Sequence, residues 1–272
     1  MKSVSLPTSY YQQFDADPKA DVPAENFGGW KQGIVELSTK HTALVIMHAW
    51  DCGKPEEWPG WDRAVEYHPR AKTVAEEVFP DLFASVRSAS ILIFHVVGGG
   101  DYYRSEEGYR KTLEIAGGSP ELRQVRSDPA YDRLQNFREN NVFVGEHNRA
   151  DVDAGQIQLK FMQVAKPQEE ELIAEDSHQL ASLCHHYGIN HLVYTGFALN
   201  WCLLMSPGGM VDMKRHGILC STIREAVTAV ENAETAREER EKQQALWRVS
   251  LNFGFVFGAE DFIAAMNLIP TK

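Results

Sequence analysis

The chain has 272 residues, of which 43% are hydrophobic and 24% are charged, and it is long enough to bury the core of one large domain. Its 38 acidic residues outnumber its 27 basic residues, giving a formal net charge of −11. This excess argues against nucleic acid or an anionic membrane as the main partner. The sequence shows no apolar signal segment, no membrane-length apolar run and no paired cysteine motif, so we expect a reduced, soluble protein of the cytoplasm.

Hydrophobic patterning predicts strands and helices in alternation. Residues 1–40 are rich in Pro, Gly and polar residues, and we expect an arm on the surface of this subunit or of a neighbouring one. The runs 42–47 and 91–97 are continuously apolar, which is typical of strands buried on both faces of a parallel sheet. Between them, apolar residues at four-residue spacing predict one amphipathic helix from Pro69 to Val86.

The rest of the chain continues this alternation. Residues 98–150 are polar and irregular, and we expect an insertion there with one helix over 129–140. The remaining expected elements are a strand over 156–164, a helix over 169–187, strands over 192–195 and 217–220, a helix over 229–247, a strand over 253–257 and a helix over 259–267. This order predicts one doubly wound, three-layer α/β/α domain over 41–272, with a mainly parallel sheet of about six strands. Its ligand crevice should lie outside the carboxyl ends of the strands.

The most informative stretch for function leads from a predicted strand to Cys202. The strand 192–195 is followed by a glycine turn, Gly196–Trp201, which brings Cys202 to the start of a new helical pattern. Unpaired N–H groups and the positive end of a helix dipole favour a thiolate there. The same N–H groups can stabilise an oxyanion when sulfur attacks a carbonyl. The alternative is a small buried hydrophobe, the interpretation that fits Cys184 and Cys220.

This stretch resembles the nucleophile motif of the isochorismatase-like cysteine hydrolases, the superfamily of nicotinamidases, N-carbamoyl amide hydrolases and isochorismatase. The resemblance extends from Thr42 to Met266 and is poor over 98–150. It is carried by the apolar first strand, by Lys166-Pro167 before the helix that ends at Gly188-Ile189, by Gly196-Phe197-Ala198-Leu199-Asn200-Trp201-Cys202, and by Glu225-Ala226 after the next strand. It implies an enzyme that hydrolyses the C–N bond of a small-molecule amide, or an ester or vinyl ether, through a covalent intermediate on Cys202.

The resemblance also implies a cation and a proton acceptor beside the nucleophile. Lys166 takes the position of the family's lysine, whose charge stabilises the thiolate. The family's aspartate directly follows the first strand, where this sequence has His48, and Asp51 lies three residues further on. Histidine is suited to accept a proton near neutral pH, so activity is expected to rise between about pH 6 and pH 7. Two alternatives stay open: Asp51 is the base, or the fold is catalytically silent and only binds a ligand.

A second departure from the family follows Cys202. The run Ser206-Pro207-Gly208-Gly209 is expected to break or delay the helix that the family's nucleophile begins. Fewer aligned peptide dipoles then support the thiolate, although the first turn supplies most of that effect.

Several residues near the predicted crevice are candidates for substrate binding. Trp50 follows the first strand and Tyr102 follows the glycines after the second, so their loops are expected to overhang the crevice and to suit a flat or cyclic substrate. The alternative is that these loops only pack onto the body. The other candidates are His95 near the end of the second strand, and Leu199 and Trp201 in the turn before Cys202.

No metal or cofactor signature stands out in the sequence. The Asp-x-His pair of the metal-dependent nicotinamidases is missing from 95–101, so we expect no metal and no other cofactor. The glycines at 98–100 lack the lysine of a phosphate loop, and no G-x-G-x-x-G follows the first strand, which argues against a dinucleotide enzyme. We expect a homo-oligomer that acts on a small molecule and binds neither nucleic acid nor membrane.

Overall fold

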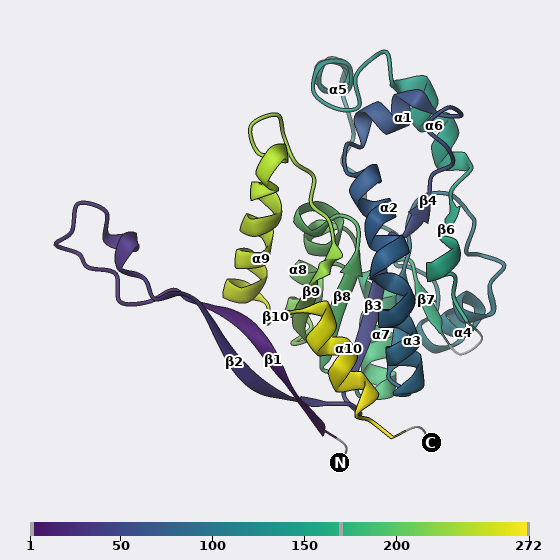
Figure 1. The fold of residues 1–272 in the computed structure, drawn as a ribbon. Coiled ribbons are helices and arrows are strands. Elements are labelled where there is room, and N and C mark those ends of the chain that lie inside the picture. Colours follow the sequence, from purple (N-terminus) through teal and green to yellow (C-terminus); the bar gives the residue numbers. More distant parts are fainter. Residues whose placement is uncertain (1–2, 169–170, 271–272) are drawn as a thin grey trace.

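The computed structural model describes residues 3–168 and 171–270, and an eight-stranded sheet lies at its centre (Figure 1). In order across the sheet, its strands are β2 (Gly29–Ser38), β1 (Ser3–Gln12), β10 (Val256–Phe257), β9 (Leu219–Val227), β8 (His191–Gly196), β3 (Thr42–Met47), β5 (Leu92–Val96) and β7 (Leu172–Ala174). The six strands from β10 to β7 are parallel, and β1 and β2 are antiparallel at one edge. The predicted α/β class with a mainly parallel sheet is confirmed.

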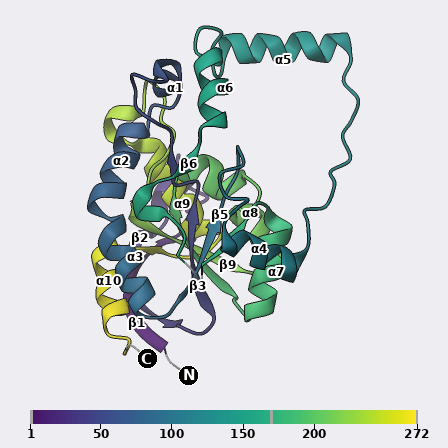
Figure 2. The ribbon, with the colours of Figure 1, turned by 90° about the vertical axis from the view of Figure 1, so that its right-hand side faces the viewer.

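Helices cover both faces of the sheet, as expected for three layers (Figures 1 and 2). On one face lie α2 (His68–Glu77), α3 (Phe79–Ser88) and α10 (Ala259–Asn267), whose apolar side chains share one core cluster. On the other face lie α7 (Ser177–Tyr187), α8 (Met210–Arg215) and α9 (Arg240–Asn252), which share a second cluster. Because both faces are covered, all six residues of β3 are buried, which explains the uninterrupted apolar run at 42–47.

Residues 3–38, within the segment expected to be an arm, form a β-hairpin. β1 and β2 pair from Ser3 with Ser38 to Gln12 with Gly29. The base of the hairpin joins the core through the buried side chains Val4, Leu6 and Leu37. Its far end, which includes the short helix η1 (Pro23–Asn26), extends away from the body (Figure 1).

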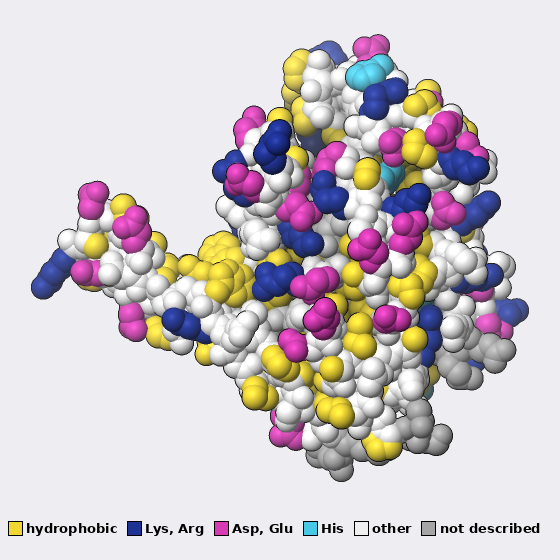
Figure 3. All heavy atoms as spheres, viewed as in Figure 1, with side chains coloured by type: hydrophobic (Ala, Val, Ile, Leu, Met, Phe, Trp, Pro, Cys, Tyr) yellow, Lys and Arg dark blue, Asp and Glu magenta, His cyan; other side chains and the backbone are white. Residues whose placement is uncertain are grey.

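Hydrophobic side chains gather at the neck where the hairpin joins the body (Figure 3). The ring of Tyr11 meets the ring of Trp30 edge-on at 5.6 Å and the ring of Trp247 at 6.4 Å. Trp30 nevertheless remains 40% exposed. The aromatic contacts therefore tie the hairpin to α9 without covering it completely.

The expected insertion contains two helices that differ in their packing. α4 (Glu107–Ala116) is bound to the body through buried Tyr109 and Thr112. α5 (Pro129–Asn141) matches the helix predicted over 129–140, but none of its residues is buried. It stands at the end of an extended connection (Figure 2), and the chain returns through α6 (Arg149–Ile157), which packs against α1 (Pro59–Ala64).

Local chemistry explains why some elements differ from the prediction. The single helix expected from Pro69 to Val86 is two helices, because Pro80 in the first turn of α3 cannot continue the α2 hydrogen bonding. The strand expected over 156–164 is replaced by the end of α6, by β6 (Lys160–Phe161) and by η2 (Gln163–Ala165). β6 pairs with β4 (Trp50–Asp51) outside the main sheet.

Two helices begin later in the sequence than predicted. The expected start of one helix at 169 lies outside the described residues, and α7 begins only at Ser177, where the Asp176 carboxylate accepts the Gln179 N–H at 2.8 Å. α9 begins at Arg240 and not near 229. Within the described residues, no helix is long and apolar enough to cross a membrane.

Candidate active site

Cys202 follows β8 at the carboxyl edge of the sheet, through a turn that requires glycine. Gly196 has φ +116°, and a Cβ atom on it would lie 1.9 Å from the Met47 carbonyl oxygen. The next residue, Phe197, donates its N–H to that same oxygen at 3.1 Å. The turn is therefore bound directly to the end of β3, and the chain enters a single π-helical turn, η3 (Leu199–Leu203), which carries Cys202.

Burial and hydrogen bonding act on the Cys202 thiol in opposite directions. Burial raises its pKa above the ordinary 9.0, whereas hydrogen bonds from the Ser206 side chain and the Ala198 backbone N–H lower it, and the net shift is upward. The thiol is therefore protonated at neutral pH when no ligand is bound.

The predicted interruption of the helix after Cys202 is confirmed. Ser206 donates its N–H to the Cys202 carbonyl oxygen at 3.1 Å, and Gly209 donates to the Ser206 carbonyl oxygen at 2.7 Å, before α8 begins at Met210. The break is fixed to α7 because the Ser177 hydroxyl accepts the Gly208 N–H at 2.7 Å. Only one helical turn therefore supports Cys202, and the dipole contribution to its thiolate is small.

His48 occupies the carboxyl end of β3, next to the Cys202 turn. Its backbone N–H donates to the Val96 carbonyl oxygen at 3.0 Å, and its φ angle is 52°. Its ring stacks on Trp50, with centroids 4.4 Å apart, and a Cβ on Gly98 would lie 3.2 Å from Nε2. Burial lowers its pKa from 6.5 to about 4, and Nδ1 is buried without a hydrogen-bond partner in the described chain. The ring is neutral at physiological pH.

Thr228 is a residue of this edge that the sequence did not reveal. It follows β9, on the other side of β8 from His48, and its carbonyl oxygen accepts the Leu199 N–H at 2.7 Å. Its hydroxyl oxygen Oγ1 is buried and lacks a partner among the described residues. Buried polar atoms without partners are uncommon in folded proteins. Position after a strand was the only sequence signal that pointed to Thr228.

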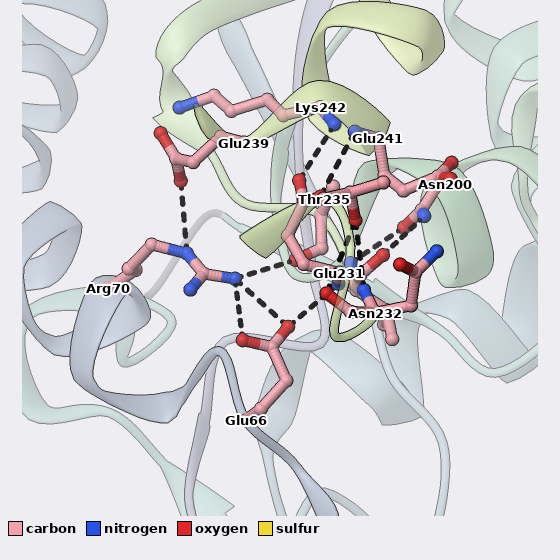
Figure 4. A network of polar contacts seen from close by, with 11 residues as sticks. Glu66, Arg70, Asn200, Glu231, Asn232, Thr235, Glu239, Glu241 and Lys242 are labelled. Atoms are coloured by element: carbon pink, nitrogen blue, oxygen red, sulfur yellow. Dashed lines mark hydrogen bonds and ion pairs between the residues drawn. The ribbon is translucent and has the colours of Figure 1, made fainter. Parts of the chain in front are cut away.

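Asn200 ties the Cys202 turn to the segment after β9 (Figure 4). Its side-chain amide donates to the Val230 carbonyl oxygen and accepts the Val230 N–H, both at 2.8 Å. The adjacent Glu231 is buried, and its carboxylate accepts the N–H groups of Glu241 and Lys242 at 3.0 Å each, which caps α9. These hydrogen bonds connect the turn that carries Cys202 to the segment after β9, and that segment to the start of α9. The thiol takes no part in them.

The same network reaches the start of α2 (Figure 4). Glu66 accepts the Glu231 N–H at 2.8 Å and an N–H of Arg70 at 2.9 Å, while Arg70 lies 3.0 Å from Glu239. Burial raises the pKa of Tyr67, which follows Glu66, and negative charge on Cys202, Cys52 or Glu66 would raise it further.

Trp50, a candidate substrate-binding residue, stacks on the His48 ring and contacts a second candidate, Tyr102. The Trp50 indole N–H donates to the Tyr102 hydroxyl at 2.8 Å. Asp51 is exposed on β4, opposite Lys160, and one of its carboxylate oxygens accepts the Gly53 N–H at 3.0 Å. Asp51 therefore faces away from the buried surroundings of His48.

A pocket of about 580 Å³ opens between α2, the loop after β4 and η2. Its lining includes Trp50, Asp51, Cys52, His68 and Met162 and does not include Cys202. Burial raises the pKa of Cys52 to about 12, and the charges of Asp51 and Asp62 add to this effect. This pocket therefore contains Cys52 and not the turn that carries Cys202.

The other four predicted site residues have different surroundings. Lys166 is exposed. It lies before the start of β7 and not at the carboxyl end of that strand. His95 is only 1% exposed in the middle of β5, where its Nε2 meets the Glu171 carboxylate at 2.8 Å. Leu199 is buried in the core, and Trp201 is 40% exposed. Within the described residues, no cluster of three or more His, Cys, Asp and Glu side chains is arranged to hold a metal ion.

Comparisons with known proteins give similarities of structure at low sequence identity. No family model matches the chain, and no curated protein matches it. A cysteine hydrolase from Pseudomonas syringae pv. phaseolicola 1448A is 10% identical, covers 85% of this chain and 94% of its own, and has a TM-score of 0.48. An isochorismatase-like hydrolase from Alkaliphilus metalliredigens is 16% identical, with 84% and 99% covered and a TM-score of 0.49. N-carbamoylsarcosine amidase from Thermoplasma acidophilum is 12% identical, with 80% and 96% covered and a TM-score of 0.41.

Proposed function

We propose that the protein is a cysteine hydrolase of the isochorismatase-like type that cleaves the C–N bond of a small-molecule amide. The observation that carries this proposal is the position of Cys202: it lies on the single helical turn that follows β8 at the carboxyl edge of the sheet, and this turn is hydrogen-bonded to the end of β3. In the proposed reaction, sulfur bonds to the carbonyl carbon, the C–N bond breaks, and the amine leaves with a proton. Water then hydrolyses the thioester, which releases the acid and restores the thiol.

His48 is the proton acceptor that we favour over Asp51. It is neutral at physiological pH, its Nδ1 has no partner in the described chain, and it follows the strand next to the Cys202 turn. Asp51 is exposed and is already bound to a backbone N–H. A base must lie within hydrogen-bonding reach of the proton that it takes, and an exposed loop carboxylate meets this condition less well.

Lys166 has no place in this scheme as the structure stands. It is exposed, and none of the described Lys or Arg side chains affects the pKa of Cys202. The thiolate must therefore be stabilised by N–H groups and by the substrate, and not by a neighbouring cation. Oxyanion stabilisation by preorganised N–H donors is the largest contribution available to this site.

A second candidate function is ligand binding without catalysis. Moving a proton from a thiol with a pKa above 9.0 to an imidazole with a pKa of about 4 is unfavourable by about 7 kcal/mol or more in the empty site. This mismatch favours a silent fold unless bound substrate changes both values. The same unpartnered atoms, Nδ1 of His48 and Oγ1 of Thr228, would then serve only to recognise a polar ligand.

The test is hydrolysis of a panel of primary amides, carbamoyl compounds and small esters by four proteins. We expect turnover by the wild type, a fall in kcat of at least about a thousandfold in Cys202→Ser, and retention in Cys52→Ser, the matched control. Mass spectrometry should detect an acyl group on the peptide that contains Cys202. His48→Ala should be as inactive as Cys202→Ser.

Three results would contradict the proposal in different ways. Loss of turnover in Cys52→Ser with retention in Cys202→Ser would move the chemistry into the pocket beside α2. Turnover that survives both substitutions would exclude a covalent cysteine mechanism. No turnover by the wild type, together with binding of a panel compound that His48→Ala abolishes, would establish the silent alternative.

A further inference from the structure

The side chain of Asn200 extends the contact between β8 and β9 beyond the end of their backbone pairing. The last residues that pair are Gly196 and Val227. Further along, Nδ2 of Asn200 donates to the Val230 carbonyl oxygen and Oδ1 accepts the Val230 N–H, both at 2.8 Å (Figure 4). A side-chain amide offers the same donor and acceptor as a peptide group. It therefore stands in for a backbone pair where the chain has left β8 for η3.

Asn200 belongs to the same short turn as Cys202. It lies two residues before the cysteine on η3, which is five residues long. The turn does not continue as a long helix, because Ser206 donates its backbone N–H to the Cys202 carbonyl oxygen and α8 begins only at Met210. A long helix would hold its first turn through many internal hydrogen bonds, and this turn has few. Its contact with the segment after β9 therefore has a larger part in holding Cys202.

Val230, the other end of this contact, is held because the residues on both sides of it are bound (Figure 4). Arg70 donates to the Ala229 carbonyl oxygen at 3.1 Å. Glu231 donates its backbone N–H to the Glu66 carboxylate at 2.8 Å, and its own buried carboxylate caps α9. The amide contact therefore ends on a support that is bound to the start of α2 and to the start of α9.

We propose that Asn200 is a positioning residue for Cys202: its amide holds η3 against the segment after β9 and so fixes where the sulfur lies. This inference rests on the proposed function, because the exact place of a thiol matters for a nucleophile. Asn200 acts through the backbone, since the hydrogen bonds to the thiol within the described chain come from Ser206 and Ala198. A displacement of a reacting group by about 1 Å can lower a rate about a hundredfold.

Asn200→Ala should change catalysis and thiol reactivity in opposite directions. On an amide that the wild type hydrolyses, kcat should fall about a hundredfold and KM should change by less than about threefold. Burial raises the pKa of Cys202, so a turn that is released toward solvent should lower this pKa toward its ordinary value. Alkylation of Cys202 by iodoacetamide at about pH 8 should then be at least about threefold faster than in the wild type.

Two controls separate this role from a general loss of structure. The matched variant is Asn232→Ala, the same change in the same network, where the side-chain oxygen accepts the Glu234 N–H at 2.9 Å within the loop after β9. It should leave kcat and the alkylation rate of Cys202 within about twofold of the wild type. Mass spectrometry should also show that the buried thiols of Cys184 and Cys220 stay unlabelled in Asn200→Ala.

Three results would overturn the positioning role. The first is a kcat of Asn200→Ala within about threefold of the wild type. The second is an equal fall of kcat in Asn232→Ala, and the third is labelling of Cys184 and Cys220 along with Cys202, because the loss would then be a general one. If the wild type hydrolyses no amide, the proposed function fails and the alkylation rate decides alone: an unchanged rate at Cys202 in Asn200→Ala would overturn this inference as well.

Discussion

His48 should titrate far below an ordinary histidine. Burial lowers its pKa from 6.5 to about 4, and its Nδ1 finds no hydrogen-bond acceptor among the described residues. The lower value corresponds to about 3 kcal/mol against the protonated ring in the folded protein. We therefore expect the imidazole to remain neutral across the neutral range and to gain its proton only in acid.

Proton NMR of the imidazole Cε1–H signals measures this directly. The signal that disappears in His48→Gln should have its midpoint near pH 4. The matched control is His191→Gln: burial also lowers the pKa of His191 to about 4, but His191 lies at the amino end of β8 and contacts Ser221 Oγ at 2.8 Å. A His48 midpoint near 6.5 would refute the reasoning from burial.

The pH dependence of catalysis should follow the same value. The sequence predicts a rise in activity between about pH 6 and pH 7 from the reference pKa of histidine. Because burial lowers the pKa of His48 to about 4, the acid limb of kcat/KM should lie near pH 4. His191→Gln should leave this limb unchanged. If Asp51→Asn shifts the acid limb of kcat/KM, Asp51 and not His48 is the proton acceptor.

The pKa of His48 also makes a prediction about stability. The unfolded chain binds the proton at about 6.5 and the folded chain at about 4, so the unfolded state holds more protons between these values. The free energy of unfolding should therefore fall as pH decreases through this window, by up to about 3 kcal/mol from this residue. In urea unfolding, the free energy of unfolding of His48→Gln should decrease less between about pH 6.5 and pH 4 than that of the wild type. An equal decrease in both proteins would contradict the burial argument.

Two further substitutions test the fold beneath the site. Gly196→Ala should destabilise by more than about 4 kcal/mol or prevent folding, because its Cβ would meet the Met47 carbonyl oxygen, whereas Gly118→Ala has open space and should be neutral. Burial raises the pKa of Glu171, but hydrogen bonds from His95 and Arg87 lower it by more, so that the net value is about 2. Its stabilisation should be complete above about pH 4.5 and lost toward pH 2, and Glu171→Gln should cost about 3–5 kcal/mol in urea unfolding, against under about 0.5 kcal/mol for exposed Glu107→Gln.

The buried strands of the sheet were predictable because short runs of apolar residues mark them in the sequence. Six consecutive buried residues in β3 can come only from a strand that is covered on both faces, and the sequence shows this as an unbroken apolar run. The closing helix over 259–267 is present with the expected bounds. β1 and β2 were missed because one face of each is largely exposed, which interrupts the apolar pattern. Short β7 was missed because three residues carry too little pattern.

The candidate site was only partly predictable, because sequence position does not give the burial or the orientation of a side chain. Position after a strand places His48 and Cys202 at the same edge, and the structure brings their backbones together through Met47 and Phe197. Sequence position does not say which way a side chain points, so His95 could not be distinguished from a crevice residue. It faces Glu171 in the interior.

The residue that follows β7 at the carboxyl edge of the sheet is a carboxylate with hydrogen-bond partners of its own. Glu175 directly follows that strand, and its carboxylate accepts hydrogen bonds from Tyr103 at 2.8 Å and from Ser119 at 2.9 Å. For Cys202 it is burial, and no neighbouring charge among the described residues, that raises the pKa, so the resting residue is a thiol. In the proposed reaction, negative charge therefore develops on the carbonyl oxygen only as sulfur attacks, and the neutral His48 ring is the proton acceptor. If hydrolysis proceeds in this way, the site favours substrates whose tetrahedral oxyanion it stabilises, and the resting thiol should react slowly with simple alkylating agents.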